Sequence, residues 1–367
     1  MITKKAKFSK VFSNIYFEKK TPISLIHFLT NRCNARCSFC FIDFDDPKTF
    51  KGELTLSEID AMTKNMGKTL LNVNFTGGEP FARKDIVDIA KLYIRNTTIQ
   101  SIYITTNGSL PDRVKNFVEE ISKHSPEIEI NLQISIDDIP EKHNSVRKIK
   151  NLFEDCLITY RLIKELKKPK INASVSITVT HENCSNIKEI FYYLIEQCKI
   201  DSIKCCLVRD EGVYARPKEK VDEILTAYDW LTNKIKEYQN KKMINNYANS
   251  IQGKIHNKKD EISWDLIKKI YKENKFISPC HASSLFGVIT ADGKVYPCEI
   301  LEDKLIGDLR NFDMNFMKLW TTQKNKDIKK FILDSKCKCT YECAMSFNIL
   351  GNWRYQYKLL SSLISYY

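Results

Sequence analysis

The feature that most constrains the fold is an alternation, over the first 210 residues, of short apolar runs with longer amphipathic stretches. A short apolar run bounded by turn residues is typical of a buried strand, and an apolar stripe repeating every three or four residues is typical of a helix. Regular alternation of the two predicts βα units around a parallel sheet. The predicted strands are residues 23–30, 71–76, 101–106, 127–136, 171–179 and 202–209.

Six such strands predict an α/β fold, a partial (β/α)6 barrel of the TIM type, in residues 23–215 behind an N-terminal extension at 1–22. Helices are expected at 56–66, with Thr55 as N-cap and Glu58 three residues on, and at 84–93. In such barrels ligands bind at the C-terminal ends of the strands. The functional residues are therefore expected in the loops that follow the strands.

Residues 216–275 predict a helical linker region and residues 276–367 a small C-terminal domain of a hairpin plus helices. A Gly in the short turn Ala291, Asp292, Gly293, between the β-rich runs 285–290 and 294–297, indicates the hairpin. The linker carries an apolar stripe at helical spacing, which predicts a helix packed on the barrel. The stripe comprises Val221, Leu225, Tyr228, Leu231, Ile235 and Tyr238.

The composition limits which compartment and which partners are expected for this chain. Hydrophobic residues make up 43% of its 367 residues, yet no run approaches the roughly 20 apolar residues that span a bilayer, so no membrane partner is expected. The basic start MITKKAKFSK is not followed by an apolar signal region, which predicts a cytoplasmic protein. Thirteen cysteines in a reducing compartment indicate metal ligation or redox chemistry instead of disulfides.

The net charge of +13 raises the alternative of nucleic-acid binding. The charge is spread along a chain rich in Lys, Asn and Ile, with only short runs such as Lys167-Lys168 and Lys258-Lys259. This distribution does not favour nucleic acid as the main partner. It is compatible with attraction of an acidic peptide or an anionic small molecule.

Three cysteines in the loop after the first predicted strand form the first metal constellation. Cys33, Cys37 and Cys40 lie in the segment CNARCSFC. Three thiolates can hold a [4Fe–4S] cluster and leave one iron without a protein ligand, where a substrate can bind. Structural zinc would need a fourth ligand, commonly from a second cysteine pair nearby, and none follows here.

With this spacing and placement the sequence resembles the radical S-adenosylmethionine (SAM) superfamily. In that family the open iron chelates the amino and carboxylate groups of SAM, and one electron cleaves the sulfonium to a 5′-deoxyadenosyl radical. Phe39 matches the aromatic residue that lies by the adenine. The resemblance also implies a flavodoxin- or ferredoxin-like electron donor.

Further matches to the family follow the second and third predicted strands. Gly77 and Gly78, with Glu79 and Pro80, follow the second strand, where two glycines allow close backbone approach and can present carbonyls to the ammonium of SAM. Asn107 ends the third. Each of these residues alone is compatible with an ordinary turn.

The fourth and sixth strands end in further matches. In similar enzymes the residues at Ser135 and Asp137 face the ribose and the one at Arg147 orients the cofactor. The resemblance further implies that Leu207 reaches the adenine and that Arg209 pairs with the methionyl carboxylate, for which a planar guanidinium is suited. Asp138 stands where many relatives have Gly, which puts the local turn geometry in question.

The C-terminal part contains a second constellation that resembles the auxiliary-cluster domains called SPASM or, in the one-cluster form, twitch. No cysteine follows Cys343, and five thiols suffice for one cluster, so we expect at least one auxiliary [4Fe–4S] cluster and favour a single one. Cys280, Cys298 and Cys343 are favoured over the other two as its ligands. Structural zinc on four of the five remains an alternative. The five cysteines are Cys280, Cys298, Cys337, Cys339 and Cys343.

Glu299 directly follows Cys298, at the position from which an acid acts as base in sulfatase-maturing relatives, so it is the candidate catalytic residue. A surface glutamate beside the hairpin is the alternative. The remaining thiols are expected to be buried and free. They are Cys156, Cys184, Cys198, Cys205 and Cys206.

Three functions follow from these observations. The first is a radical SAM enzyme that abstracts hydrogen from a peptide or protein, giving an oxidation, crosslink or epimerisation, although no separate peptide-recognition domain is expected in the 22 residues before the first strand. The second is the same chemistry on a small molecule, such as an alcohol, a sugar or a cofactor precursor. The third is a non-catalytic, zinc-stabilised basic binding protein, which leaves the ordered strand-end motifs unexplained.

Overall fold

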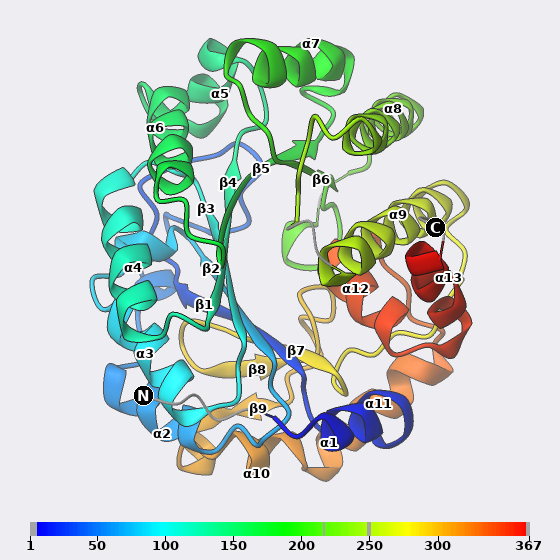
Figure 1. Cartoon of the computed structure of the whole chain (residues 1–367). Helices are drawn as coiled ribbons and strands as arrows, with labels where there is room; N and C mark the ends of the chain where they lie inside the picture. The colour runs from blue at the N-terminus through cyan, green and yellow to red at the C-terminus, as the bar shows by residue number, and fades with distance from the viewer. Residues whose placement is uncertain (1–5, 216, 248–250, 365–367) are drawn as a thin grey trace.

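The computed structural model describes residues 6–215, 217–247 and 251–364, and it confirms the predicted fold class. Six parallel strands form consecutive neighbours of one curved sheet, and helices cover its outer face (Figure 1). Every predicted strand is present within two residues of its expected bounds. The strands are β1 (Ser24–Thr30), β2 (Asn72–Gly77), β3 (Ser101–Thr106), β4 (Glu129–Ser135), β5 (Ile171–Val179) and β6 (Ile203–Leu207).

The two faces of the sheet differ because side chains alternate along a strand. On β4, Ile130, Leu132 and Ile134 are buried in the core shared with the outer helices. Their neighbours Glu129 and Gln133 point to the inner face. On this strand the apolar outer face fixes the register, and the inner face is polar.

The outer layer contains α2 (Leu56–Lys64), which begins as predicted. Thr55 and Glu58 form a reciprocal capping box, with Thr55 N donating to Glu58 Oε2 at 2.8 Å. The other helices of this layer are α3 (Ile86–Asn96), α4 (Pro111–His124), α5 (Pro140–Arg147), α6 (Leu152–Glu165) and α7 (Ile187–Tyr192).

The predicted helical region after the barrel contains α8 (Val221–Asn240) and α9 (Ile251–Glu273). On α8 the stripe residues Tyr228, Leu231 and Ile235 are buried, as predicted. Helix α9 contacts the C-terminal helices, and Figure 1 shows it between β6 and those helices on the open side of the barrel. This region therefore joins the barrel to the C-terminal part.

The predicted hairpin is confirmed as β7 (Phe286–Ile289) and β8 (Lys294–Tyr296). It extends the barrel sheet, because β7 pairs in parallel with β1, and β8 carries the short β9 (Gly307–Asp308). Four helices follow, and a short helix precedes β1. They are α10 (Phe316–Trp320), α11 (Gln323–Asp334), α12 (Glu342–Leu350), α13 (Trp353–Ile364) and, at the N-terminus, α1 (Phe8–Ser13).

Among the described residues, no helix has the length and apolar character needed to cross a membrane.

The junction of β7 with the C-terminal helices predicts a sensitive position. A Cβ added at Gly287 would lie 2.7 Å from two ring carbons of Trp320, which is fully buried. We expect Gly287→Ala to lower the free energy of unfolding by about 1–3 kcal/mol through overpacking, measured by urea denaturation. Because Trp320→Phe would make room, the double variant should lose less than the two single losses combined; simple additivity would contradict this explanation.

Candidate functional site

The cysteine loop after β1 is held by backbone hydrogen bonds to the end of α5. Arg36 N donates to Arg147 O at 3.1 Å, and Ser38 N donates to Val146 O at 3.3 Å. Within the loop, Cys40 N donates to Cys37 O at 3.1 Å. The sequence-predicted constellation is thus anchored to the helix that carries Arg147.

The two glycines after β2 pack against the backbone that leads into this loop. A Cβ on Gly77, whose φ is +132°, would lie 2.2 Å from Thr30 O, and one on Gly78 would lie 2.3 Å from Arg32 O. Gly78 N donates to Thr30 O at 2.7 Å. Only glycine allows the two backbone segments to lie this close together. A structural requirement therefore explains both glycines, whether or not they also contact a ligand.

Glu79 is a buried acceptor at the ends of β2 and β3. Its carboxylate accepts hydrogen bonds from Phe81 N at 3.0 Å, Thr106 Oγ1 at 2.8 Å and Asn107 N at 2.7 Å. Burial raises the pKa of Glu79, and these hydrogen bonds oppose the rise. The geometry gives Glu79 a role in fixing the two strand ends.

Asn107 reaches from the end of β3 to the cysteine loop. Its amide Nδ2 donates to Asn34 Oδ1 at 2.9 Å and lies 3.8 Å from Cys33 Sγ. Its Oδ1 accepts from Ser109 N at 3.0 Å. Of the predicted strand-end residues, Asn107 therefore lies directly beside a cysteine of the first constellation.

Asp137 and Arg147 form a buried ion pair next to the cysteine loop. Arg147 Nη2 donates to Asp137 Oδ2 at 2.5 Å, and both side chains are 9% exposed. Asp137 Oδ1 also accepts from Thr178 N at 2.9 Å. Burial opposes ionisation of Asp137, but the charges of Arg147 and His143 and the hydrogen bonds from Arg147 and Thr178 together outweigh it and lower the pKa of the carboxyl. Ser135, two residues earlier, ends β4 and is half-buried.

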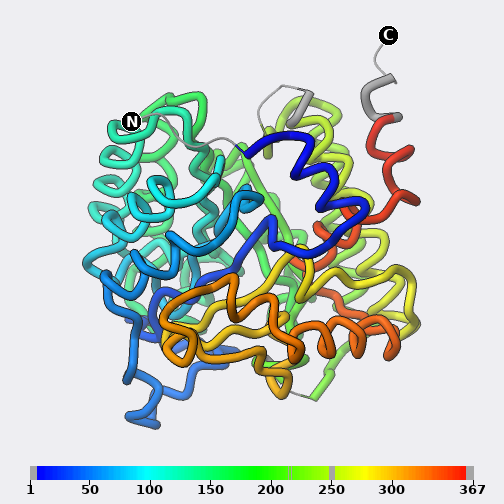
Figure 2. The backbone as a smooth tube through the Cα atoms, turned by 90° about the horizontal axis from the view of Figure 1, so that it is seen from below, coloured from blue at the N-terminus to red at the C-terminus, as the bar shows by residue number. Residues whose placement is uncertain are grey.

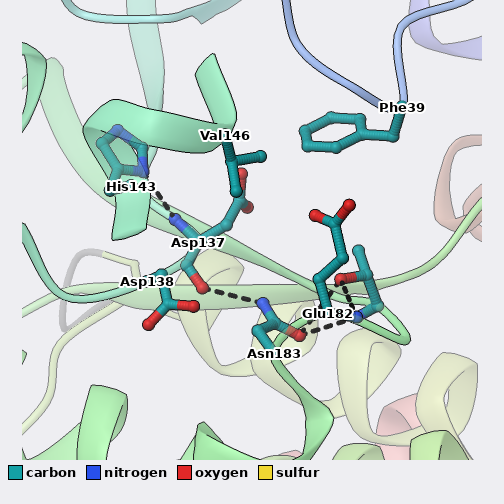
Figure 3. Close-up of a pocket in the computed structure, with 8 residues that line it drawn as sticks. Phe39, Asp137, Asp138, His143, Val146, Glu182 and Asn183 are labelled. Atoms are coloured by element: carbon teal, nitrogen blue, oxygen red, sulfur yellow. Dashed lines mark hydrogen bonds between the residues drawn. The ribbon is translucent and has the colours of Figure 1, made fainter. Parts of the chain in front are cut away.

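A pocket opens where β4 and β5 end, between the cysteine loop and α5 (Figure 3). Phe39 extends into it from the loop, while His143 and Val146 come from α5. Asp138 keeps its place in the turn without a positive φ, so the question raised by its departure from Gly is resolved. The lining is Phe39, Asp137, Asp138, His143, Val146, Thr180, Glu182 and Asn183.

Five of the pocket residues were not predicted from the sequence: His143, Val146, Thr180, Glu182 and Asn183. Asn183 Nδ2 donates to Asp137 O at 2.7 Å, Glu182 Oε1 accepts from Ser38 Oγ at 3.0 Å, and His143 Nδ1 lies 3.3 Å from Asp137 N. The available signal for Glu182 and Asn183 was their position in the turn after β5. For His143 the only signal in the sequence was its spacing of four residues from Arg147, which puts both on one face of a helix.

Arg209 and Glu299, which the sequence assigned to separate roles, contact each other. Arg209 Nη1 lies 3.0 Å from Glu299 Oε2, and the guanidinium lies 4.5 Å from the ring centre of Tyr341. Glu299 is buried, and its Oε2 is 3.9 Å from Cys343 Sγ. The pair therefore joins the loop after β6 to the second cysteine constellation. The alternative of an exposed surface glutamate at this position is wrong.

Glu342 makes a further contact between the barrel and the C-terminal part, and the sequence did not predict it. Its Oε1 accepts from Leu207 N, at the end of β6, at 2.9 Å. Burial raises the pKa of Glu342. Since Glu342 directly precedes Cys343, this contact positions an auxiliary cysteine against the sixth strand. Leu207 itself is buried, with 1% of its surface exposed.

The five C-terminal cysteines are close enough for their charges to interact. The pKa of Cys280 and that of Cys298 are each raised to about 12, first by burial and further by neighbouring cysteines. Burial also raises the pKa of Cys343 to about 12, while Arg209 lowers it. Cys337 and Cys339 are coupled to the same group. The structure therefore does not divide the five into ligands and bystanders.

Both constellations suit iron–sulfur clusters. Burial raises the pKa of Cys33 to about 11, and that of Cys37 also rises with burial but is opposed by Arg147. In the described ranges, no three or more His, Cys, Asp or Glu side chains are arranged to hold a single ion. The two sets provide three and five thiols, and cysteine thiolates are the usual protein ligands of iron–sulfur clusters.

The remaining five thiols form no disulfide, and four of the five are buried as predicted. Cys156, Cys184, Cys198 and Cys205 are buried, and Cys206 is half-buried on the inner face of the barrel. Cys156 Sγ donates to Asn107 O at 3.0 Å, so this thiol supports the strand end that approaches Cys33.

Comparison with known families gives two matches. The model of the radical SAM superfamily matches residues 28–194, and that of the SPASM iron-sulfur cluster-binding domain matches residues 280–344. The first match covers the barrel from within β1 to the segment before β6, and the second covers all five C-terminal cysteines.

Curated relatives include proteins with different substrates. The chain is 30% identical over 198 residues to Fe-coproporphyrin III synthase of Methanosarcina barkeri, a match that covers 50% of this chain and 46% of the relative. It is 24% identical over 290 residues to the sporulation killing factor maturation protein SkfB of Bacillus subtilis, covering 78% and 62%. The chain thus spans about half to three-fifths of the length of these relatives.

A solved structure described as native anSMEcpe with bound AdoMet has the same fold. The TM-score is 0.63 with 18% sequence identity, and the match covers 94% of this chain and 98% of that one. It includes both the barrel and the C-terminal part.

The buried Asp137–Arg147 pair predicts a pH-dependent stability. Asp137→Asn leaves the Arg147 charge without its partner, so we expect a loss of about 3 kcal/mol or more in the unfolding free energy of cluster-free protein at neutral pH. Because the pKa of Asp137 is lowered in the folded state, its contribution is complete above the unfolded pKa of about 3.9 and disappears as pH falls through the folded value.

Urea denaturation between neutral and acidic pH measures this difference. Asp138→Asn is the matched control, because an asparagine there can still accept the hydrogen bond from Ile139 N. The control should lose less than about 1 kcal/mol. A loss for Asp137→Asn no larger than the control's, or one independent of pH, would contradict the assignment.

Proposed function

We propose, since this chain belongs to the radical SAM superfamily and carries a SPASM domain, that it abstracts a hydrogen atom from a peptide or protein substrate. The outcome would be an oxidation, a crosslink or an epimerisation. The observation that carries the proposal is the position of Glu299. This buried acid lies beside Cys298 and Cys343 and contacts the loop that follows β6.

The cofactors follow from the family. A radical SAM enzyme with a SPASM domain holds a SAM-binding [4Fe–4S] cluster and at least one auxiliary iron–sulfur cluster. SAM bound at the first cluster supplies a 5′-deoxyadenosyl radical when it is reduced. We assign Cys33, Cys37 and Cys40 to the first cluster. We assign the auxiliary cluster to four of the five C-terminal cysteines.

The SAM pocket is assigned to the strand ends around the cysteine loop. Phe39 is proposed to lie against the adenine, and Ser135 and Asp137 to face the ribose. Arg147, already paired with Asp137, would hold that carboxylate in one orientation while placing a positive charge near the cysteine loop. Glu79 acts by fixing the strand ends that flank Asn107, because its carboxylate is fully engaged in hydrogen bonds.

Arg209 and Glu299 are proposed to work together. In the structure Arg209 holds the Glu299 carboxylate, and Tyr341 stacks on the guanidinium. If Arg209 turns to the methionyl carboxylate of SAM, Glu299 loses this partner and is available to accept a proton from the substrate. An auxiliary cluster on the neighbouring cysteines would assist electron transfer or substrate binding.

A peptide substrate is supported by the extent of the similarity. The relative SkfB, named as a maturation protein, matches 78% of this chain, whereas the match to Fe-coproporphyrin III synthase covers half. The latter name keeps a small-molecule substrate as the second candidate. We also propose a flavodoxin- or ferredoxin-like electron donor and a cytoplasmic location. The SPASM match argues against the zinc-stabilised binding protein.

Iron content tests the cluster assignment. Anaerobically reconstituted protein should bind about eight irons per chain, falling to about four when Cys33, Cys37 and Cys40 are all changed to Ala. The same fall is expected when the three favoured auxiliary cysteines are changed, which are Cys280, Cys298 and Cys343. About four irons falling to none in the first variant would contradict an auxiliary cluster. Zinc without iron would refute the radical mechanism.

The substrate class and Glu299 are tested together. Any short peptide found to be encoded next to this gene is the substrate to test, incubated with SAM and a reductant. Peptide-dependent 5′-deoxyadenosine release and a changed peptide mass are expected, and Glu299→Gln should reduce product about a hundredfold or more while 5′-deoxyadenosine release persists.

Glu302→Gln is the matched control, because Glu302 is an exposed glutamate three residues further along the same loop. It should retain full product formation. Undiminished product with Glu299→Gln would remove Glu299 from catalysis. Turnover with a small molecule and none with the peptide would favour the second candidate.

A further inference from the structure

Large apolar side chains from the two ends of the described chain gather on one exposed surface, which we call the terminal patch. Phe8 is 82% exposed, Tyr357 80%, Phe17 68% and Trp353 55%. Six of the ten exposed large hydrophobic side chains in the described residues belong to it, so the exposure is concentrated here. The patch comprises Phe8, Phe12, Phe17, Trp353, Tyr357 and Leu360.

Direct contacts hold the two halves of the terminal patch together. The rings of Tyr16 and Trp353 lie 4.3 Å apart, and Phe12 and Phe17 each lie 6.3 Å from Trp353. Tyr16 Oη donates to Gln356 Oε1 at 2.9 Å. Figure 2 shows the N-terminal segment beside the C-terminal helix on one side of the molecule. The aromatic side chains are therefore displayed by a fixed framework.

The two segments that carry the terminal patch are cationic. Lys7, Lys10, Lys20 and Arg354 are all exposed beside it, and Glu18 is the one acid in residues 6–20 and 351–360. Lys20 lies 3.8 Å from Glu18, which leaves a positive excess around the aromatic surface.

We propose that the terminal patch binds the surface of an anionic lipid bilayer. Aromatic rings and leucine on one face, with Lys and Arg beside them, are the composition of surfaces that bury apolar side chains at the headgroup level of anionic membranes. From the sequence we expect no membrane partner because no segment spans a bilayer, but binding at the surface needs no span.

A second copy of this chain fits the surface less well. A two-fold contact through the same patch would bring the lysines and Arg354 of one copy near those of the other. Such like charges oppose association, whereas anionic headgroups would neutralise them. The charge pattern therefore favours lipid over self-association.

Vesicle binding tests the proposal with the reconstituted full chain. Co-sedimentation is expected with vesicles of phosphatidylcholine containing phosphatidylglycerol, and weakened by high salt or by omitting phosphatidylglycerol. Serine in place of the three most exposed patch residues should reduce partitioning about tenfold or more. The changes are Phe8→Ser, Phe17→Ser and Tyr357→Ser.

Matched controls come from exposed residues elsewhere, which should leave binding unchanged. The double variant Lys7→Glu, Lys10→Glu should weaken binding to anionic vesicles. The control double variant Lys123→Glu, Lys168→Glu makes the same change of charge elsewhere and should weaken binding less. Iron content and 5′-deoxyadenosine release should be equal in all variants, which separates this test from the proposed function. The apolar controls are Ile158→Ser, Met243→Ser and Leu333→Ser.

Four results would overturn the proposal. The first is absence of binding to anionic vesicles at low salt, and the second is equal binding by the patch and control variants. The third is a wild-type dimer in solution that the patch variant converts to a monomer, because that would assign the surface to a second copy. Binding to an acidic protein without binding to vesicles would equally exclude lipid as the occupant.

Discussion

The pairing of β1 on both its edges is the constraint on which the rest of the structure depends. All seven residues of β1 are buried, with β2 paired on one edge and β7 on the other. The first cysteine constellation follows the end of this strand, and β7, which lies beside it, leads through β8 to Cys298. One strand therefore fixes the positions of both cysteine sets, and a shift of register by one residue would exchange the side chains of its two faces.

Buried polar groups then set the strand ends to which the site is attached. Glu79 joins the ends of β2 and β3, and Asp137 joins the end of β4 to β5 and to Arg147. Burying a carboxylate costs free energy unless its oxygens accept hydrogen bonds or pair with a positive charge. Each of these carboxylates is therefore stable in only one arrangement of the strand ends around it. The apolar outer face provides stability, while these polar contacts specify where the loops lie.

The sequence predicts the parts of this arrangement that local patterns determine. The strands follow from apolar runs, the start of α2 from Thr55 and Glu58, and the first cluster loop from the spacing of Cys33, Cys37 and Cys40. It could not predict that β7 joins the barrel sheet, because hairpin signals do not identify the neighbouring strand. Nor could it predict contacts such as Arg209 with Glu299 or Leu207 with Glu342, whose partners lie 90 and 135 residues apart.

These long-range contacts bear on how the two cysteine sets communicate. The sixth strand is the last of the barrel, and the contacts of its end with the C-terminal part include Glu342 at Leu207 and Glu299 at Arg209. Both acids directly adjoin auxiliary cysteines, Cys343 and Cys298. A change at Arg209 would therefore act on the surroundings of the auxiliary site through side chains already in contact, without movement of the sheet. Coupling by such a route needs only the exchange of one ion-pair partner for another.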